Sequence, residues 1–336
     1  MKSKLKIKST NELSLVLGVN GQDGSYLAES LLKRGRGVVG VGRQEVSRYV
    51  PNSENFSYRQ LDIANIKGLV LLLNELSPNK IFHVAAIHGS HGFNYEEKWL
   101  EAHSVNTLTV HAILEYLRCV GGAGNLIYLS SSKAFSSPLP ALVSETAERK
   151  SSCIYSITKN TATDLVHYYR ATHGVSANVL WMFNHESIRR GEEYFIPRIV
   201  NCLASAIENP DHSEEIFTLN FYADWSDVSE LMDIAIIAGD ICPHEDFIFA
   251  SGETTSARAL VKSLFANFGL DYRNHVTEKN RGEFAVAGWR ADISKMNRML
   301  ERKPTLSIYD ACLKMLESKY GYDGKNNFLM NDLSHD

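Results

Sequence analysis

Cysteine is scarce in this sequence, with five residues in 336, and no two of them form a C-x-x-C pair. The five are Cys119, Cys153, Cys202, Cys242 and Cys312. Scattered thiols of this kind favour reduced, mostly buried cysteines in a cytoplasmic protein over a disulfide framework. The histidines are also dispersed. His88 and His91 could face one another, but no further ligands accompany them, so we expect no metal site.

Long apolar runs are also absent, which argues against a transmembrane helix. The basic start, Met1 to Lys8, has no apolar run after it and therefore does not resemble a signal peptide. A formal net charge of -4 argues against general nucleic-acid binding. Repeats and low-complexity linkers are missing too, while 44% hydrophobic and 22% charged residues are ordinary for a soluble globular protein.

What is present is an alternation of short apolar runs with amphipathic stretches. The runs predict strands at 13–18, 37–41, 58–63, 80–86, 125–131, 176–182 and 246–250. Between and after them the pattern predicts helices at 25–34, 67–76, 99–118, 151–171, 196–208, 228–238, 256–268 and 306–318. Strands that alternate with helices indicate a doubly wound parallel sheet.

A glycine-rich turn follows the first predicted strand. Gly18, Gly21 and Gly24 are spaced three residues apart, with Gln22 and Asp23 between the last two, and a helix comes next. Glycines between a strand and a helix allow a tight turn and a close approach of backbone to a pyrophosphate. The alternative is a merely tight turn. Together with the β-α alternation, the turn predicts a Rossmann-like dinucleotide-binding sheet.

The ends of the second and third strands indicate which dinucleotide would bind. Arg43 follows the second strand, and a cation there suits the 2′-phosphate of NADP, whereas an acid would suit NAD. Asp62 ends the third strand, where it would lie beside the adenine ring. We therefore expect NADP(H), with NAD(H) as the alternative; Arg43 could instead be a solvated surface residue.

Tyr155 and Lys159 lie four residues apart on a predicted helix, with Ser131 at the end of the preceding strand. This spacing places the phenol and the ammonium on one helix face. The positive charge would lower the pKa of Tyr155 towards neutrality, and Ser131 would hold a carbonyl or alcohol oxygen against the phenol. The three residues are candidates for a catalytic proton relay. The alternative is two residues on a solvated helix face.

Three longer stretches carry a family resemblance: Gly21-Gln-Asp-Gly-Ser-Tyr-Leu-Ala-Glu29, Phe183-Asn-His-Glu-Ser187 followed by Arg189-Arg-Gly-Glu192, and Phe249-Ala-Ser-Gly252. With Asp224-Trp225, they resemble the extended short-chain dehydrogenases/reductases and, within that group, GDP-mannose 4,6-dehydratase. The resemblance implies NADP(H), a nucleotide-diphosphate sugar, hydride transfer at sugar C4, and a homodimer or homotetramer.

Carried over to this sequence, the resemblance implies that Asn184 contacts the sugar diphosphate. Arg190, Arg198 and Arg281 are further candidates for substrate contacts, since guanidinium groups match phosphate oxygens. Arg198 and Arg281 could equally be surface salt-bridge residues. For the domains, we expect a cofactor-binding domain at 1–183, a mainly substrate-binding mixed α/β cap at 184–323 with segments that return to the sheet, and a tail at 324–336.

Three positions depart from the family pattern. The dehydratases carry a glutamate two residues after the catalytic Ser or Thr, and that glutamate removes the C5 proton; here the residue is Lys133. Lysine is a cation at neutral pH unless burial depresses its pKa strongly. Ala223 and Ile199 replace an arginine and a lysine of the family, which puts GDP specificity in doubt.

These departures favour an NADP(H)-dependent nucleotide-sugar oxidoreductase that acts at C4, either a 4-ketoreductase or a 4-epimerase or 4-dehydrogenase, with Tyr155 as acid or base. One alternative is a 4,6-dehydratase with a relocated base, for which Glu145 or Glu186 would have to serve. Another is a non-catalytic cofactor-binding subunit, which would have no physical need for an intact Ser-Tyr-Lys relay.

Overall fold

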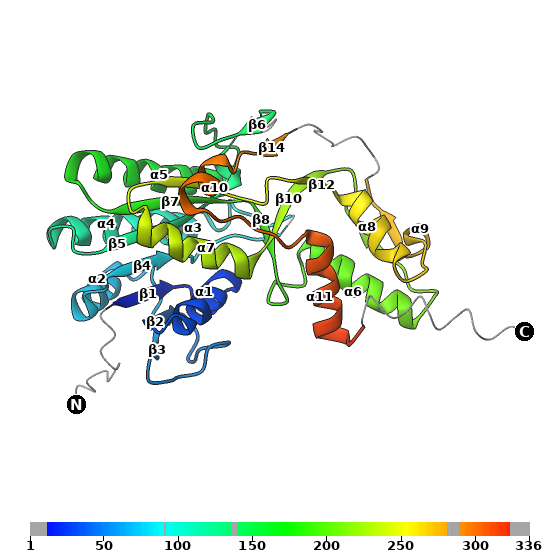
Figure 1. Ribbon diagram of the computed structural model, residues 1–336, viewed down its shortest axis with the longest axis horizontal. Coiled ribbons are helices and arrows are strands. Elements are labelled where there is room, and N and C mark those ends of the chain that lie inside the picture. The colour runs from blue at the N-terminus through cyan, green and yellow to red at the C-terminus, as the bar shows by residue number, and fades with distance from the viewer. Residues whose placement is uncertain (1–11, 91, 136–139, 281, 283–288, 323–336) are drawn as a thin grey trace, which may run out of the picture.

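A seven-stranded parallel sheet forms the centre of the computed structural model, which describes residues 12–90, 92–135, 140–280, 282 and 289–322 (Figure 1). Its strand order is β11-β7-β5-β4-β1-β2-β3. The strands are β1 (Leu13–Leu17), β2 (Gly37–Gly42), β3 (Phe56–Gln60), β4 (Lys80–His83), β5 (Asn125–Ser131), β7 (Ala177–Met182) and β11 (Asp246–Phe249). Nearly every side chain of β1, β2, β5 and β7 is buried, as expected for a sheet that is covered on both faces.

Helices cover both faces of this sheet. One apolar core lies under α2 (Ile66–Leu76), α4 (Thr109–Cys119) and α5 (Ile154–His173). The core on the other face lies under α1 (Gln22–Lys33), α7 (Val228–Ile241) and α10 (Ser294–Leu300). This arrangement confirms the predicted Rossmann-like doubly wound fold.

The strand order reverses between β1 and β4. These two strands are neighbours, with Leu15 opposite Ile81, yet the chain passes from β1 to β2 and β3 before it crosses back to β4. Loops at such a switch point leave the sheet in opposite directions and open a crevice at the carboxyl ends of the strands. The crevice is where a ligand site is expected.

A smaller mixed unit covers one end of the sheet. It contains a three-stranded sheet in the order β12-β10-β8 and a two-stranded pair, β13-β9. These strands are β8 (Asn184–Glu186), β9 (Glu214–Ile216), β10 (Tyr222–Asp227), β12 (Thr254–Ser256) and β13 (Val276–Glu278). Its helices are α6 (Phe195–Glu208), α8 (Ala257–Ala266), α9 (Tyr272–His275) and α11 (Ile308–Tyr320). A third apolar core joins them, and Figure 1 shows them beyond the carboxyl edge of the large sheet.

Segments after residue 184 also return to the large sheet. These are β11, α7 and α10; in addition, the short strand β14 (Arg290–Ala291) pairs with β6 (Leu142–Val143) in a separate two-stranded sheet. The chain therefore passes more than once between the two parts of the molecule. The expected tail at 324–336 lies outside the described residues.

The prediction of one uninterrupted helix over 99–118 was wrong in its detail. α3 (Trp99–His103) leads into a π-helical turn, Ser104–Leu108, and only then into α4. Asn106 lies in this π turn, where its Oδ1 accepts from the Ile87 amide at 2.9 Å and its Nδ2 donates to Thr158 Oγ1 at 3.0 Å. π turns are frequent at functional sites, and this one ties the loop after β4 to helix α5. Among the described helices, none has the length and apolar character that crossing a membrane requires.

Candidate active site

A cavity of about 440 Å³ opens at the carboxyl ends of β1, β4 and β5, where the switch point predicts a ligand site. Of the residues predicted to bind cofactor or to act in catalysis, all line this cavity: Gly18, Gly21, Gln22, Asp23, Gly24, Arg43, Asp62, Ser131, Tyr155 and Lys159. Asn184 and Arg190 line it from the opposite side. The fold thus brings together residues that are up to 172 positions apart (18 to 190).

The glycine turn has a shape that only glycines allow. Gly18 has a φ of +101°, and a Cβ there would lie 2.9 Å from backbone atoms of Ala85. A Cβ on Gly24 would lie 2.3 Å from the Gly18 carbonyl oxygen. Helix α1 begins directly after Gly21, so its free amides point towards the cavity. Free amides at a helix start in a glycine turn fit a pyrophosphate, and the site therefore suits a dinucleotide.

The far end of the cavity is polar and open. Arg43 and Asp62 both line it, and both side chains are exposed. Asp62 accepts a hydrogen bond from the Ala64 amide at 3.0 Å, and the Arg43 carbonyl accepts from Gln60 Nε2 at 3.1 Å. These bonds hold the backbone while the guanidinium remains available to an anion.

The relay residues converge as the spacing predicts. Helix α5 begins at Ile154, where Ser156 Oγ accepts from the Cys153 amide at 3.0 Å, and this start places Tyr155 in its first turn. Ser131 ends β5 beside the Tyr155 side chain, close enough for its hydroxyl to favour a lower pKa of the phenol. The Lys159 ammonium lies 5.8 Å from the centre of the Tyr155 ring.

The predicted effect of Lys159 on Tyr155 was wrong. Burial raises the pKa of Tyr155 above its ordinary value, and the Ser131 hydroxyl only partly opposes this effect. The Lys159 ammonium donates instead to the Leu129 carbonyl at 2.7 Å and lies 4.8 Å from the Tyr128 ring. Burial also lowers the pKa of Lys159 to about 7, although Asp23 opposes the change. Tyr155 is therefore a protonated phenol at neutral pH, beside a lysine that is about half ionised.

A buried ion pair joins the glycine turn to strand β8. His185 Nε2 lies 3.1 Å from Asp23 Oδ1, and His185 Nδ1 donates to the Phe183 carbonyl at 2.6 Å. Burial alone would lower the pKa of His185, but the charge of Asp23 and its hydrogen bond raise it above the ordinary value. Burial would raise the pKa of Asp23, but His185 and Arg190 lower it overall. Beside this pair, Gln22 Oε1 accepts from Ser187 Oγ at 2.8 Å.

Of the candidate substrate arginines that the structure describes, Arg190 lies in the cavity wall and Arg198 does not. Arg190 lines the cavity, its guanidinium stacks 3.6 Å from the Tyr194 ring centre, and its buried Nε has no hydrogen-bond partner among the described residues. The structure does not bring Arg198 into the cavity, so its predicted substrate contact has no geometric support. Arg198 lies on α6 outside the cavity lining, where Nε and Nη2 both donate to Glu214 Oε1, at 2.9 and 2.7 Å. Arg281 lies outside the described residues.

The two other departures from the family pattern are apolar and buried. Ile199 is fully buried in the core of the cap, and Ala223 is 5% exposed in the same core. Neither side chain reaches the cavity lining.

Lys133 lines the cavity. It lies in a 3-10 turn (Ser132–Ala134), and its amide donates to Ser131 Oγ at 3.2 Å. The two glutamates considered as a relocated base do not line the cavity. Glu145 accepts from the Ile248 amide at 3.0 Å. Glu186 is buried behind Arg190, 3.7 Å from its Nε, and burial raises the pKa of Glu186 to about 7.

Several cavity residues were not predicted as site residues, and His88 and Tyr194 are two of them. His88, considered only as a metal ligand, stacks on Tyr155 with ring centres 4.6 Å apart. Tyr194 lies 6.2 Å from His88 and under Arg190. The place of His88 two residues after the small Ala85-Ala86 pair, at the end of a predicted strand, is the one signal that could have identified it. His91 lies outside the described residues.

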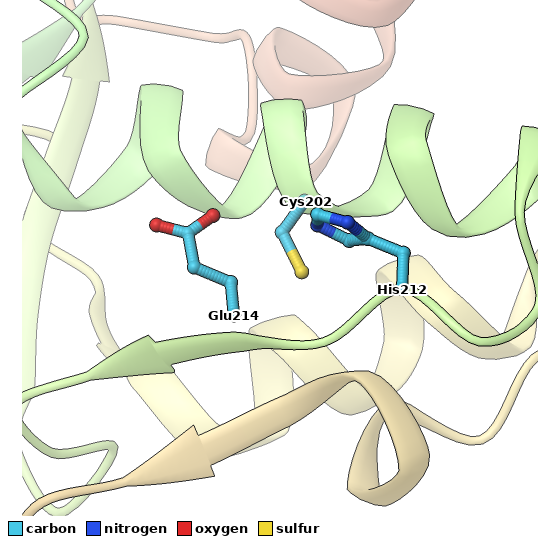
Figure 2. Close-up of side chains that lie close together, drawn as sticks. All are labelled: Cys202, His212 and Glu214. Carbon is cyan, nitrogen blue, oxygen red and sulfur yellow. The ribbon is translucent and has the colours of Figure 1, made fainter.

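A different group of potential metal ligands lies in the cap (Figure 2). Cys202 on α6 meets His212 and Glu214, with their ligand atoms within 4.8 Å of one another. Burial raises the pKa of the Cys202 thiol to about 12, and its Sγ donates to the His275 carbonyl at 3.3 Å. Glu214 is already paired with Arg198. A protonated thiol and a neighbouring guanidinium oppose a cation, so we assign no metal to this group.

Comparison with known proteins identifies relatives over most of the sequence. A model of the GDP-mannose 4,6 dehydratase family matches residues 15–315. The GDP-mannose 4,6 dehydratase of Drosophila melanogaster is 27% identical over an alignment of 355 positions, which covers 95% of this chain and 88% of the relative. The human GDP-mannose 4,6 dehydratase is 26% identical, with 76% of this chain and 72% of the relative covered.

Solved structures share the fold at lower identity. A UDP-glucose 4-epimerase from Thermotoga maritima with UDP-glucose has a TM-score of 0.76 at 19% identity, covering 91% of this chain and 97% of that one. A dTDP-glucose 4,6-dehydratase from Bacillus anthracis in complex with NAD has a TM-score of 0.78 at 14% identity, covering 94% and 99%. RMD from Pseudomonas aeruginosa complexed with NADPH has a TM-score of 0.73 at 16% identity, covering 91% and 98%. Because the family model spans nearly the whole sequence and the fold agrees, the chain belongs to the GDP-mannose 4,6 dehydratase family of the extended short-chain dehydrogenases/reductases.

Proposed function

We propose that the protein is an NADP(H)-dependent oxidoreductase that acts at C4 of a nucleotide-diphosphate sugar and does not dehydrate it. The observation that carries the proposal is the strand end Ser131 to Lys133. It brings a hydroxyl to Tyr155 and a lysine, rather than a glutamate, to the same cavity wall. Neither Glu145 nor Glu186 lines that wall to replace the missing base.

Tyr155 carries the acid-base step. Its phenol carries a proton at neutral pH, and this proton can pass to a C4 carbonyl oxygen. Ser131 holds the same oxygen through its hydroxyl. When bound in the glycine turn, the dinucleotide would supply the hydride for C4. In a 4-ketoreductase Tyr155 would give its proton to the sugar oxygen, and the same groups would act in reverse in a 4-epimerase or 4-dehydrogenase.

Substrate and cofactor would share the cavity. The amides at the start of α1 fit the cofactor pyrophosphate, and Arg43 is placed for the 2′-phosphate of NADP(H). Fold relatives are named as complexes with NAD and with NADPH, so the preference for NADP rests on Arg43. Asn184 and Arg190 face the cavity from the cap and would meet the sugar diphosphate.

The test follows NADPH absorbance and product mass for a panel of nucleotide sugars with and without a 4-keto group. We expect NADPH oxidation with a 4-keto sugar and no 4-keto-6-deoxy product from GDP-mannose. A Tyr155→Phe variant should lose about 10²- to 10⁴-fold in kcat while it still binds cofactor. The matched control is Tyr169→Phe, since Tyr169 lies on the same helix away from the cavity lining.

Two results would overturn the proposal. Formation of the 4-keto-6-deoxy product would restore the dehydratase alternative and show that Lys133 does not prevent elimination. Unchanged turnover in Tyr155→Phe would show that Tyr155 does not carry the acid-base step. Cofactor binding without turnover of any sugar in the panel would favour the non-catalytic subunit.

A further inference from the structure

Two aromatic rings, those of His88 and Tyr95, stack on Tyr155, and the proposed chemistry does not use them. His88 stacks on Tyr155 with ring centres 4.6 Å apart and planes 29° apart. Tyr95 stacks on Tyr155 at 5.7 Å and 27°. His88 Nδ1 and the Tyr95 hydroxyl are joined by a hydrogen bond of 2.7 Å. Both rings come from the segment after β4, whose residues 84–88 line the cavity.

The direction of this hydrogen bond follows from its surroundings. The Gly89 amide lies 3.5 Å from the Tyr95 oxygen and donates to it. Burial raises the pKa of Tyr95 to about 12, so the phenol keeps its proton at neutral pH. Because a neutral phenol is the stronger donor of the pair and an unprotonated imidazole nitrogen the stronger acceptor, we assign the donation to Tyr95, towards His88 Nδ1. The imidazole proton then resides on Nε2.

The charge of His88 is also determined by its place. Burial of the ring against Tyr155 and, after it, the charges of Arg190 and Lys159 lower the pKa of His88 below its ordinary value, although part of the side chain stays exposed to solvent. A neutral imidazole is a poor general base at neutral pH, because efficient proton transfer needs a pKa near the working pH. A neutral imidazole with a fixed Nε2–H is, however, a good directional donor. Among the described residues, no second hydrogen bond of the ring is found, so Nε2–H is available to a ligand.

We propose that His88 is a specificity-determining residue that recognises a hydroxyl on the sugar carbon next to the one on which Tyr155 acts. This inference rests on the proposed function. Ser131 and Tyr155 are both committed to the reacting oxygen. A donor stacked directly beside the Tyr155 ring meets the neighbouring oxygen of the same sugar ring. Tyr95 acts as a positioning residue, since its hydroxyl fixes which nitrogen of His88 donates.

The test compares two substrates in matched variants. The substrates are a 4-keto nucleotide sugar and its analogue that lacks the hydroxyl next to C4. His88→Phe keeps the stacked ring and removes the donor, whereas His88→Gln keeps an N–H donor of similar reach. His111→Phe is the control, because His111 makes the same kind of bond, Nε2 to Tyr169 hydroxyl at 3.0 Å, on α4 outside the cavity lining.

For the hydroxylated substrate, we expect His88→Phe to lower kcat/KM about 10- to 100-fold, since a donor to a polar substrate group is lost. For the deoxy analogue, His88→Phe should differ little from the wild type. His88→Gln should recover part of the loss, and Tyr95→Phe should lose activity with the hydroxylated substrate only. His111→Phe should match the wild type with both substrates.

The two proposals fail in different ways. If the wild type reduces the hydroxylated substrate but His88→Phe loses the same factor with both substrates, His88 only packs against Tyr155 and the inference is wrong. An unchanged kcat/KM of His88→Phe with both substrates would also contradict the inference. If the wild type turns over neither 4-keto sugar, the proposed function fails and the inference falls with it.

Discussion

Replacing Lys159 with methionine tests whether this lysine is as strongly perturbed as its burial implies. The side chain is 2% exposed, its ammonium donates to the Leu129 carbonyl, and burial lowers its pKa from 10.5 to about 7. Methionine has a similar length without a charge. The substitution therefore removes the titration while it keeps most of the volume in place.

The sign of the effect follows from proton linkage. Between pH 7 and 10.5 the unfolded chain holds a proton on Lys159 that the folded chain has largely released. The free energy of unfolding therefore rises with pH in this window, by at most about 1.4 kcal/mol per pH unit. From pH 7.5 to pH 9, the wild type should gain about 2 kcal/mol relative to Lys159→Met. Other groups that titrate in this range are shared by both proteins and cancel in the difference.

The assay is urea denaturation of both proteins, followed by tryptophan fluorescence, at several pH values between 7.5 and 9. Lys67→Met is the control, since Lys67 is exposed on α2 and its removal should leave the pH dependence of the wild type unchanged. A constant offset between wild type and Lys159→Met would refute the reasoning. It would show that Lys159 titrates in the folded protein much as it does in the unfolded chain.

Three further variants test other parts of the molecule. Arg43→Ala should lower the preference for NADPH over NADH about 10- to 100-fold, since a charged hydrogen bond to the 2′-phosphate is lost; equal affinity ratios by fluorescence titration would contradict the NADP assignment. His185→Gln should destabilise the protein by about 2–4 kcal/mol because Asp23 keeps a buried charge without its partner. The difference in free energy of unfolding between wild type and His185→Gln, measured by urea denaturation, should be largest below pH 6.5. It should decline as the pH rises through the raised pKa of His185, and a difference that does not depend on pH would exclude a charged pair. Leu100 and Ile157 are 61% and 40% exposed on helices α3 and α5, which pack against each other. If the protein is an oligomer through this face, the double variant Leu100→Glu with Ile157→Glu should have a lower mass by light scattering than the wild type. An unchanged mass would place the interface elsewhere.

Much of the fold follows from local patterns that the sequence displays directly. The strands that carry the site are short apolar runs, and strands buried on both faces need no tertiary information to be recognised. Gly18 and Gly24 are required by a turn whose atoms are close in sequence, apart from the contact with Ala85. Tyr155 and Lys159 share a helix face because their spacing is fixed by helix geometry.

What could not be predicted depends on contacts between distant segments. The raised pKa of Tyr155 comes from burial under His88 and Tyr95, about 60 residues earlier in the chain. The sequence shows a lysine near a phenol but not that the lysine turns to the Leu129 carbonyl. Arg198 likewise appears free in the sequence, whereas the fold pairs it with Glu214 on the adjacent strand β9.

The strand end after β5 explains how one chain could keep redox chemistry and lose elimination. Ser131 Oγ is held by the backbone amide of residue 133, so the position of the hydroxyl does not depend on which side chain residue 133 carries. The side chain at 133 meanwhile faces the cavity. A change from glutamate to lysine there would reverse the charge at the elimination step without displacing Ser131 from its place beside Tyr155. The relay and the eliminating base would then be separable parts of the same turn, and under the proposed function only the relay is retained.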